Sequence, residues 1–145
     1  MLHLALRYGA RMFLGFTAFF LCMHLLGWSQ HYFLRVFNGL IQGLGLWLVL
    51  RAWLNQYPER HDDYPAAVAL GLLTTLAATL PFAVFMTIFL AYSPGFMAFI
   101  QSQTPMGAYF NPVTASVFIL MEGIAGGLIG SYILFRIQEA LRWPA

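Results

Sequence analysis

The chain has 145 residues, of which 61% are hydrophobic and only 8% are charged, with a formal net charge of +2. Soluble domains carry roughly a quarter charged residues, so this chain has too few charges to coat a water-facing surface. The small, scattered positive charge also excludes the basic patch that nucleic-acid binding requires. The composition therefore predicts an integral membrane protein whose main partner is the lipid bilayer.

Four long apolar segments follow one another along the chain. A helix needs about 20 mostly apolar residues to cross a bilayer, and these segments are far longer than the strands of a membrane barrel. The first segment lacks a small-x-small cleavage motif and a second segment follows closely, which favours a retained helix over a signal peptide. We therefore predict an all-α fold with one domain of four transmembrane helices in an antiparallel bundle, over residues 12–28, 33–54, 66–92 and 113–135.

Short polar motifs mark the helix boundaries. Asp63 and Pro65 suit the first turn of the third helix, and Asn111 suits the N-cap of the fourth, with Pro112 behind it. The connection over residues 93–112 carries an apolar stripe followed by polar residues, which predicts a short helix in the plane of the membrane surface. Two interpretations of this loop stay open: a cover over the helix ends, and a docking surface for another subunit.

The positions of the arginines predict the orientation, because basic residues concentrate on the cytoplasmic side of membrane proteins. The chain has seven basic residues and all are arginine. Six of them fall on one side of the membrane if both termini share that side: Arg7, Arg11, Arg51, Arg60, Arg136 and Arg142. Only Arg35 falls on the other side. Both termini are therefore expected in the cytoplasm.

Glu122 lies near the middle of the fourth predicted helix, where an acidic side chain costs about 2.5 kcal/mol or more on insertion scales. When the spans are aligned by their midpoints, Gln42 and Thr79 fall at about the same depth. Lipid-facing positions would leave all three polar groups unsatisfied. We expect them to meet inside the bundle as an intramembrane polar cluster, with Glu122 protonated or hydrogen-bonded to Gln42.

Glycines recur at four-residue spacing on two of the predicted helices. Such glycines let helix backbones approach closely, either within one bundle or between chains. The predicted helix-packing positions are Gly39, Gly43, Gly123, Gly126, Gly127 and Gly130. Pro81, near the middle of the third helix, removes a backbone hydrogen bond and predicts a kink, with a gating hinge as the alternative.

His24 is the one weak candidate for a cofactor ligand, because imidazole can ligate a haem or a chlorin. Bis-histidine ligation inside the membrane would need a second intramembrane histidine, and His3, His31 and His61 fall outside the predicted spans. A hydrogen-bonded packing role is favoured, and no cofactor is expected. The sequence shows no nucleophile–base pair, phosphate-binding loop or zinc-ligand spacing, so neither catalysis nor a metal site is predicted.

Three segments carry a resemblance to a known family. Gly39-Leu-Ile-Gln-Gly-Leu-Gly-Leu-Trp-Leu-Val-Leu-Arg51-Ala ends the second predicted helix, Pro94-Gly95-Phe96 follows the third, and Glu122-Gly123 lies in the fourth. Together they resemble an uncharacterised family of small four-helix bacterial membrane proteins, described only as a domain of unknown function. The resemblance implies the bacterial inner membrane as the location, and it implies no activity.

Two functions from different classes fit these observations. The lack of catalytic motifs, the glycine spacing and the short cytoplasmic loops favour a non-catalytic structural or accessory subunit of a larger bacterial membrane complex, such as a respiratory, photosynthetic or secretion assembly. Its partners would be other membrane subunits. The alternative is a small oligomeric proton-coupled transporter or channel that uses Glu122, with Pro81 as its hinge. A third, weaker prediction is a pigment- or haem-carrying subunit that uses His24.

Overall fold

The computed structural model describes residues 1–31, 33 and 36–142 of the chain. Arg35, the one arginine predicted on the opposite side of the membrane from the other six, lies outside the described residues. Four helices in this range are long and apolar enough to cross a membrane. They are α1 (Leu2–Leu25), α2 (Val36–Gln56), α3 (Tyr64–Tyr92) and α5 (Pro112–Arg142). The described residues form no strand. The predicted all-α class and the presence of four potential spans are confirmed.

The connections after α2 contain the short helices η2 (Pro58–Arg60), α4 (Pro94–Ser102) and η3 (Gly107–Tyr109). The α4 helix falls within the connection where a short helix is predicted. Its Met97 is 7% exposed and packs into the same apolar cluster as Phe82 and Leu90 of α3. This contact holds α4 against the end of α3. Its position at a membrane surface stays a prediction.

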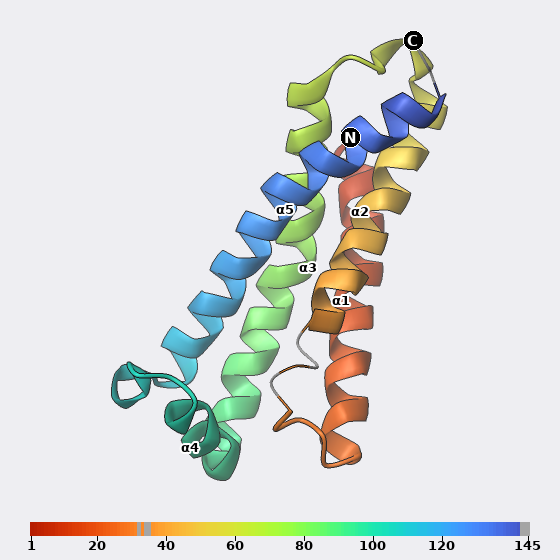
Figure 1. Cartoon of the computed structure of the whole chain (residues 1–145). Coiled ribbons are helices and arrows are strands. Elements are labelled where there is room, and N and C mark those ends of the chain that lie inside the picture. The colour runs from red at the N-terminus through yellow and green to blue at the C-terminus, as the bar shows by residue number, and fades with distance from the viewer. Residues whose placement is uncertain (32, 34–35, 143–145) are drawn as a thin grey trace.

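The α3 helix has the most extensive contacts with the other long helices (Figure 1). It packs along α5 on one side and along α1 on the other, whereas α2 contacts α1 and α5 and touches α3 less. The start of α1 and the end of α5 lie at the same end of the long helices, together with the connection between α2 and α3. The α4 helix lies at the opposite end (Figure 1).

Two helices extend beyond the predicted spans. The α1 helix begins at Leu2 instead of near residue 12, and α5 continues to Arg142 instead of ending near residue 135. The apolar segments of the sequence end at the first charged residues, but the packing of side chains between helices continues past them. Ala5 is fully buried and Gln138 is only 2% exposed, so both ends are held against other helices. Arginine, glutamate, alanine and leucine are also good helix formers.

Local motifs define where the helices begin and end. Gly27 has a φ of 73°, in the left-handed region that glycine adopts without strain, and it terminates α1. Asp63 Oδ1 accepts a hydrogen bond from the Ala66 N–H at 3.1 Å, which caps α3 as its acidic start predicts. At the start of α5, Asn111 Oδ1 accepts from the Thr114 N–H at 2.9 Å. The predicted N-cap role of Asn111 is confirmed.

Buried apolar side chains form two clusters along the helices. The first lies at the end that holds the chain termini and centres on Trp53 and Phe135, whose ring centroids are 5.9 Å apart. The second lies toward α4 and includes Phe16 and Phe82, with ring centroids 5.5 Å apart. Many other large apolar side chains point outward, as expected for surfaces that face lipid.

The α3 helix runs through Pro81 without interruption (Figure 1). Proline cannot donate to the carbonyl one turn earlier, yet the helix keeps its regular assignment on both sides. The hydroxyl groups of Thr74 and Thr79 donate to Leu70 O and Thr75 O at 2.8 and 2.9 Å. These bonds satisfy both hydroxyls inside the apolar interior of α3. A gating hinge at Pro81 stays a prediction.

Candidate functional site

A polar contact joins the middle of α2 to the middle of α5. Gln42 Nε2 donates to the carbonyl oxygen of Gly123 at 2.8 Å. Thr79 of α3 approaches the same glycine, since a Cβ placed on Gly123 would lie 2.5 Å from Thr79 Cγ2. Gln42 and Thr79, predicted at one depth, therefore both contact Gly123, the residue next to Glu122.

We expected Glu122 to be enclosed by the helices of the bundle. In the structure its side chain is exposed on the surface of the single chain. Successive residues of an α-helix are about 100° apart around the axis, so a glycine that faces α3 turns its neighbour away from α3. Gly126, one turn after Glu122, faces α2, because a Cβ there would lie 3.1 Å from Gln42 Oε1. Glu122 is thus exposed on the side of α5 that borders α2. A hydrogen bond between Glu122 and Gln42 stays a prediction.

The six predicted packing glycines divide into two groups. Four of them meet side chains of α2 or α3: Gly123, Gly126, Gly127 and Gly130. The other two, Gly39 and Gly43 on α2, face open space, since a Cβ at either position would find no described heavy atom within 4 Å. The helix contacts among the described residues therefore leave the Gly39-x-x-x-Gly43 motif unused. We call the surface around Gly39, Gly43, Gln42 and Glu122 the open α2–α5 face.

Two glycines outside the predicted motifs, Gly9 and Gly71, also lie at close contacts between helices. A Cβ on Gly9 would lie 2.8 Å from the carbonyl oxygen of Thr74, so α1 and α3 approach each other at backbone distance there. Gly71 of α3 leaves room for the side chain of Ser131 on α5. Sequence reasoning missed both positions, because neither glycine belongs to a four-residue repeat with another glycine.

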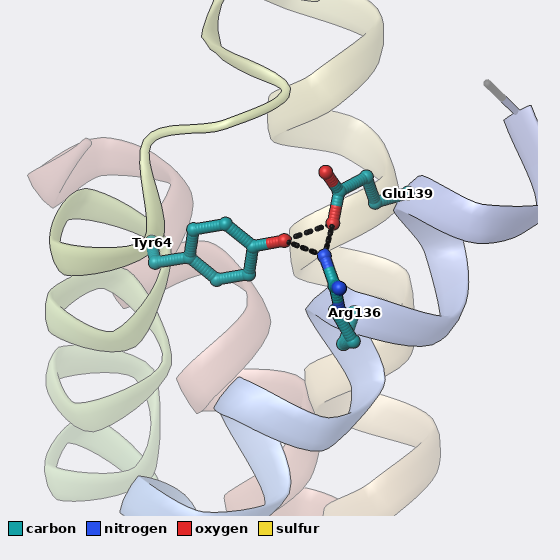
Figure 2. A network of polar contacts seen from close by, with 3 residues as sticks. All are labelled: Tyr64, Arg136 and Glu139. Carbon is teal, nitrogen blue, oxygen red and sulfur yellow. Dashed lines mark hydrogen bonds and ion pairs between the residues drawn. The ribbon is translucent and has the colours of Figure 1, made fainter. Parts of the chain in front are cut away.

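A second polar cluster lies where α3 begins and α5 approaches its end (Figure 2). The Tyr64 hydroxyl donates to Glu139 Oε2, and Arg136 Nη1 donates both to the Tyr64 oxygen and to Glu139 Oε2, the latter at 2.8 Å. The Glu139 side chain is 19% exposed, whereas that of Arg136 is 64% exposed. Sequence reasoning missed this cluster because the fourth predicted helix stopped before it, although the three-residue spacing of Arg136 and Glu139 is a usable signal.

The candidate cofactor ligand, His24, lies near the end of α1 among phenyl rings. Its ring centroid is 4.9 Å from that of Phe89 on α3, and Phe20 and Phe96 lie 6.2 and 6.4 Å away. These rings link α1, α3 and α4 in one aromatic group, which fits a packing role for the imidazole. The described part of the chain holds no group of three or more His, Cys, Asp or Glu side chains suited to a metal ion.

No family model, curated protein or solved structure matches this chain. The resemblance to a four-helix bacterial family of unknown function accordingly stays a prediction.

Proposed function

We propose that this chain is a non-catalytic accessory subunit of a larger complex in the bacterial inner membrane. In this proposal the four long helices form an antiparallel bundle, and the arginine-rich end that also holds both chain ends lies in the cytoplasm. The α4 helix then lies at the outer surface of the membrane. The larger complex in this proposal is a respiratory, photosynthetic or secretion assembly.

The open α2–α5 face carries the proposal. Small residues at four-residue spacing allow two membrane helices to approach at backbone distance. Gly39 and Gly43 have this spacing, but the described residues of the chain place nothing against them. A helix supplied by another subunit would fill this space. The occupant we propose is thus a transmembrane helix of a partner protein, packed along the outer half of α2.

Glu122 adds a chemical requirement for that partner. Its side chain is exposed at mid-helix, next to exposed apolar residues such as Phe118 and Met121. Exposure of a carboxyl group to lipid at this depth is costly. A partner helix with a hydroxyl, amide or basic side chain at the same level would shield the carboxyl group from lipid. Polar side chains are known to join membrane helices in this way.

A proton-coupled transporter or channel is the second candidate, and the exposure of Glu122 is the observation that favours it. A carboxyl group at mid-helix, next to the glycine whose carbonyl oxygen accepts from Gln42 of a neighbouring helix, has the chemistry of a proton-binding site. Four helices rarely enclose a path alone, so this function requires at least a dimer. In that case the open α2–α5 faces of two copies would meet and place two Glu122 residues near each other.

Native purification tests the subunit proposal. The chain is purified from its host in mild detergent, and mass spectrometry identifies the proteins that accompany it. Gly43→Leu should release them, because a leucine would occupy the space of the partner helix while finding no obstacle within its own chain. Gly95→Leu is the matched control, since Gly95 also faces open space but lies on α4. A lone monomer from the natural chain, or equal release by both variants, would contradict the proposal.

Reconstitution separates the two candidates. Purified chain in liposomes should show no pH-driven flux of substrate or protons if it is an accessory subunit. Flux that disappears in Glu122→Gln, with Glu59→Gln as the control for an acid in the connection after α2, would instead establish the transporter. Flux that persists in Glu122→Gln would remove Glu122 as the coupling site.

A further inference from the structure

A pocket of about 200 Å³ lies between α2 and α5 at the end that holds both chain termini. Its walls are formed by Trp47, Arg51, Gln138, Leu141 and Arg142. Two of these side chains are cationic and two are apolar. The pocket therefore combines positive charge with an apolar flank.

The two arginines of the pocket are not engaged elsewhere in the described part of the chain. Neither Arg51 nor Arg142 makes a hydrogen bond or an ion pair with another described residue. The Glu139 carboxylate on α5 is bound by Arg136 and Tyr64 (Figure 2). Among the described residues, no carboxylate forms an ion pair with either guanidinium group.

Gln138 supplies the polar group between them. It is 2% exposed, and its Nε2 donates to the carbonyl oxygen of Trp47 at 2.8 Å, which ties α5 to α2. Because the side-chain nitrogen makes this bond, the other polar atom of the amide is the oxygen Oε1, which can only accept a hydrogen bond. That Oε1 is buried and has no hydrogen-bond donor among the described residues. Buried polar atoms without a partner are rare in proteins, so the site is one donor short.

We propose that this pocket binds the headgroup of an anionic phospholipid of the phosphatidylglycerol type. Guanidinium groups bind phosphate oxygens through charge-assisted, often bidentate hydrogen bonds. A glycerol hydroxyl beside the phosphate provides the donor that Gln138 Oε1 lacks. Trp47 and Leu141 flank the first carbons of the acyl chains, as aromatic residues at membrane interfaces do. Basic pockets between membrane helices on the cytoplasmic side are suited to such headgroups.

The lipid site is separate from the open α2–α5 face. Arg51 lies two helical turns beyond Gly43 toward the end of α2, and Arg142 lies at the last residue of α5. Loss of lipid binding would therefore leave the release of partner subunits by Gly43→Leu unaffected. Equally, a chain without partner subunits would still bind the lipid, so failure of either proposal can be recognised independently.

Native mass spectrometry of the purified full-length chain, titrated with phosphatidylglycerol or phosphatidylcholine in mixed micelles, tests the site. Phosphatidylglycerol should bind at least tenfold more tightly, because phosphatidylcholine has neither net charge nor a hydroxyl donor. Arg51→Gln and Arg142→Gln should each weaken binding about fivefold, the contribution of one basic residue near an anionic headgroup. Arg11→Gln is the control, since it removes the same charge from the exposed surface of α1 and should change nothing.

Gln138→Leu tests the missing donor. It should reduce the preference for phosphatidylglycerol over phosphatidylcholine, because the acceptor for the headgroup hydroxyl is gone. Equal binding of the two lipids by the natural chain would overturn the proposal, as would an Arg11→Gln effect as large as that of Arg51→Gln. Full displacement of the lipid by millimolar inorganic phosphate would assign the site to free phosphate instead and would also overturn it.

Discussion

On the side of α5 that borders α3, glycines and short hydroxyl side chains bring the two helices together, as Gly127 does against Thr75. On the side that borders α2, two long amide side chains make the polar contacts. Gln42 reaches from α2 to Gly123 O, and Gln138 reaches from α5 to Trp47 O, both at 2.8 Å. One interface is thus made by close backbones and the other by extended side chains.

This difference accounts for where the open surfaces lie. Close-packed helices leave no room for other molecules, whereas helices joined by long side chains leave space beside and between those chains. The unfilled space at Gly43 and the pocket at Arg51 both occur along α2, and the pocket also borders α5. We therefore regard the α3 side of α5 as the part that holds the chain together. The α2 side is the part that the two proposals assign to other molecules.

Replacing Glu122 by leucine should give the largest effect. Removing an acid from the middle of a membrane helix and adding a leucine should favour insertion of the α5 segment by about 3 kcal/mol. The measurement is a glycosylation-based insertion assay on the isolated segment, with Met121→Leu as the control at the neighbouring exposed position. Unchanged insertion would mean that Glu122 does not lie in the membrane interior, and the open α2–α5 face would then lose its polar requirement.

Gly127→Leu should destabilise the chain by about 2 kcal/mol, the usual range for overpacking a close contact. A Cβ at this position would lie 2.5 Å from Thr75 Oγ1, and the buried α3 helix cannot withdraw. Gly43→Leu is the counterpart on the α2 side and should leave the free energy of unfolding within about 0.5 kcal/mol. Reversible unfolding in mixed micelles compares the two. Equal destabilisation would show that the two sides of α5 do not differ in the way described.

Much of this fold could be predicted from the sequence, because hydropathy identifies long apolar helices and Asp63 and Asn111 mark helix starts. Hydropathy cannot show that α5 continues past Phe135, since the continuation depends on Gln138 packing against α2. The spacing of glycines likewise identifies candidates for close contact but not which side a neighbour occupies. Gly43 and Gly127 look alike in the sequence, and only the arrangement of the helices distinguishes them.

Tyr64→Phe should lower stability by about 1 kcal/mol, the typical net contribution of a hydrogen bond. The substitution keeps the ring in contact with Phe135, 5.2 Å between centroids, and removes only the hydroxyl that joins Arg136 and Glu139. Tyr132→Phe is the control, because this tyrosine is 53% exposed and its ring lies tilted against that of Tyr64, without a hydrogen bond to a described residue. A larger loss in the control would mean that the cluster does not stabilise the α3 side of α5.

Gly126→Ala should change the free energy of unfolding least among these substitutions. It tests the boundary between the α2 side and the α3 side of α5. The added Cβ would lie 3.1 Å from Gln42 Oε1, the end of a flexible side chain that can move by a few tenths of an ångström. The better helix propensity of alanine offsets that adjustment, so the unfolding free energy should change by less than about 0.5 kcal/mol.

Gly123→Ala, whose Cβ would meet the stiff Thr79 side chain at 2.5 Å, should destabilise by more than 1 kcal/mol, at the lower end of the overpacking range. If Gly126→Ala proves equally damaging, Gln42 is held rigidly and the α2 side is as closely packed as the α3 side.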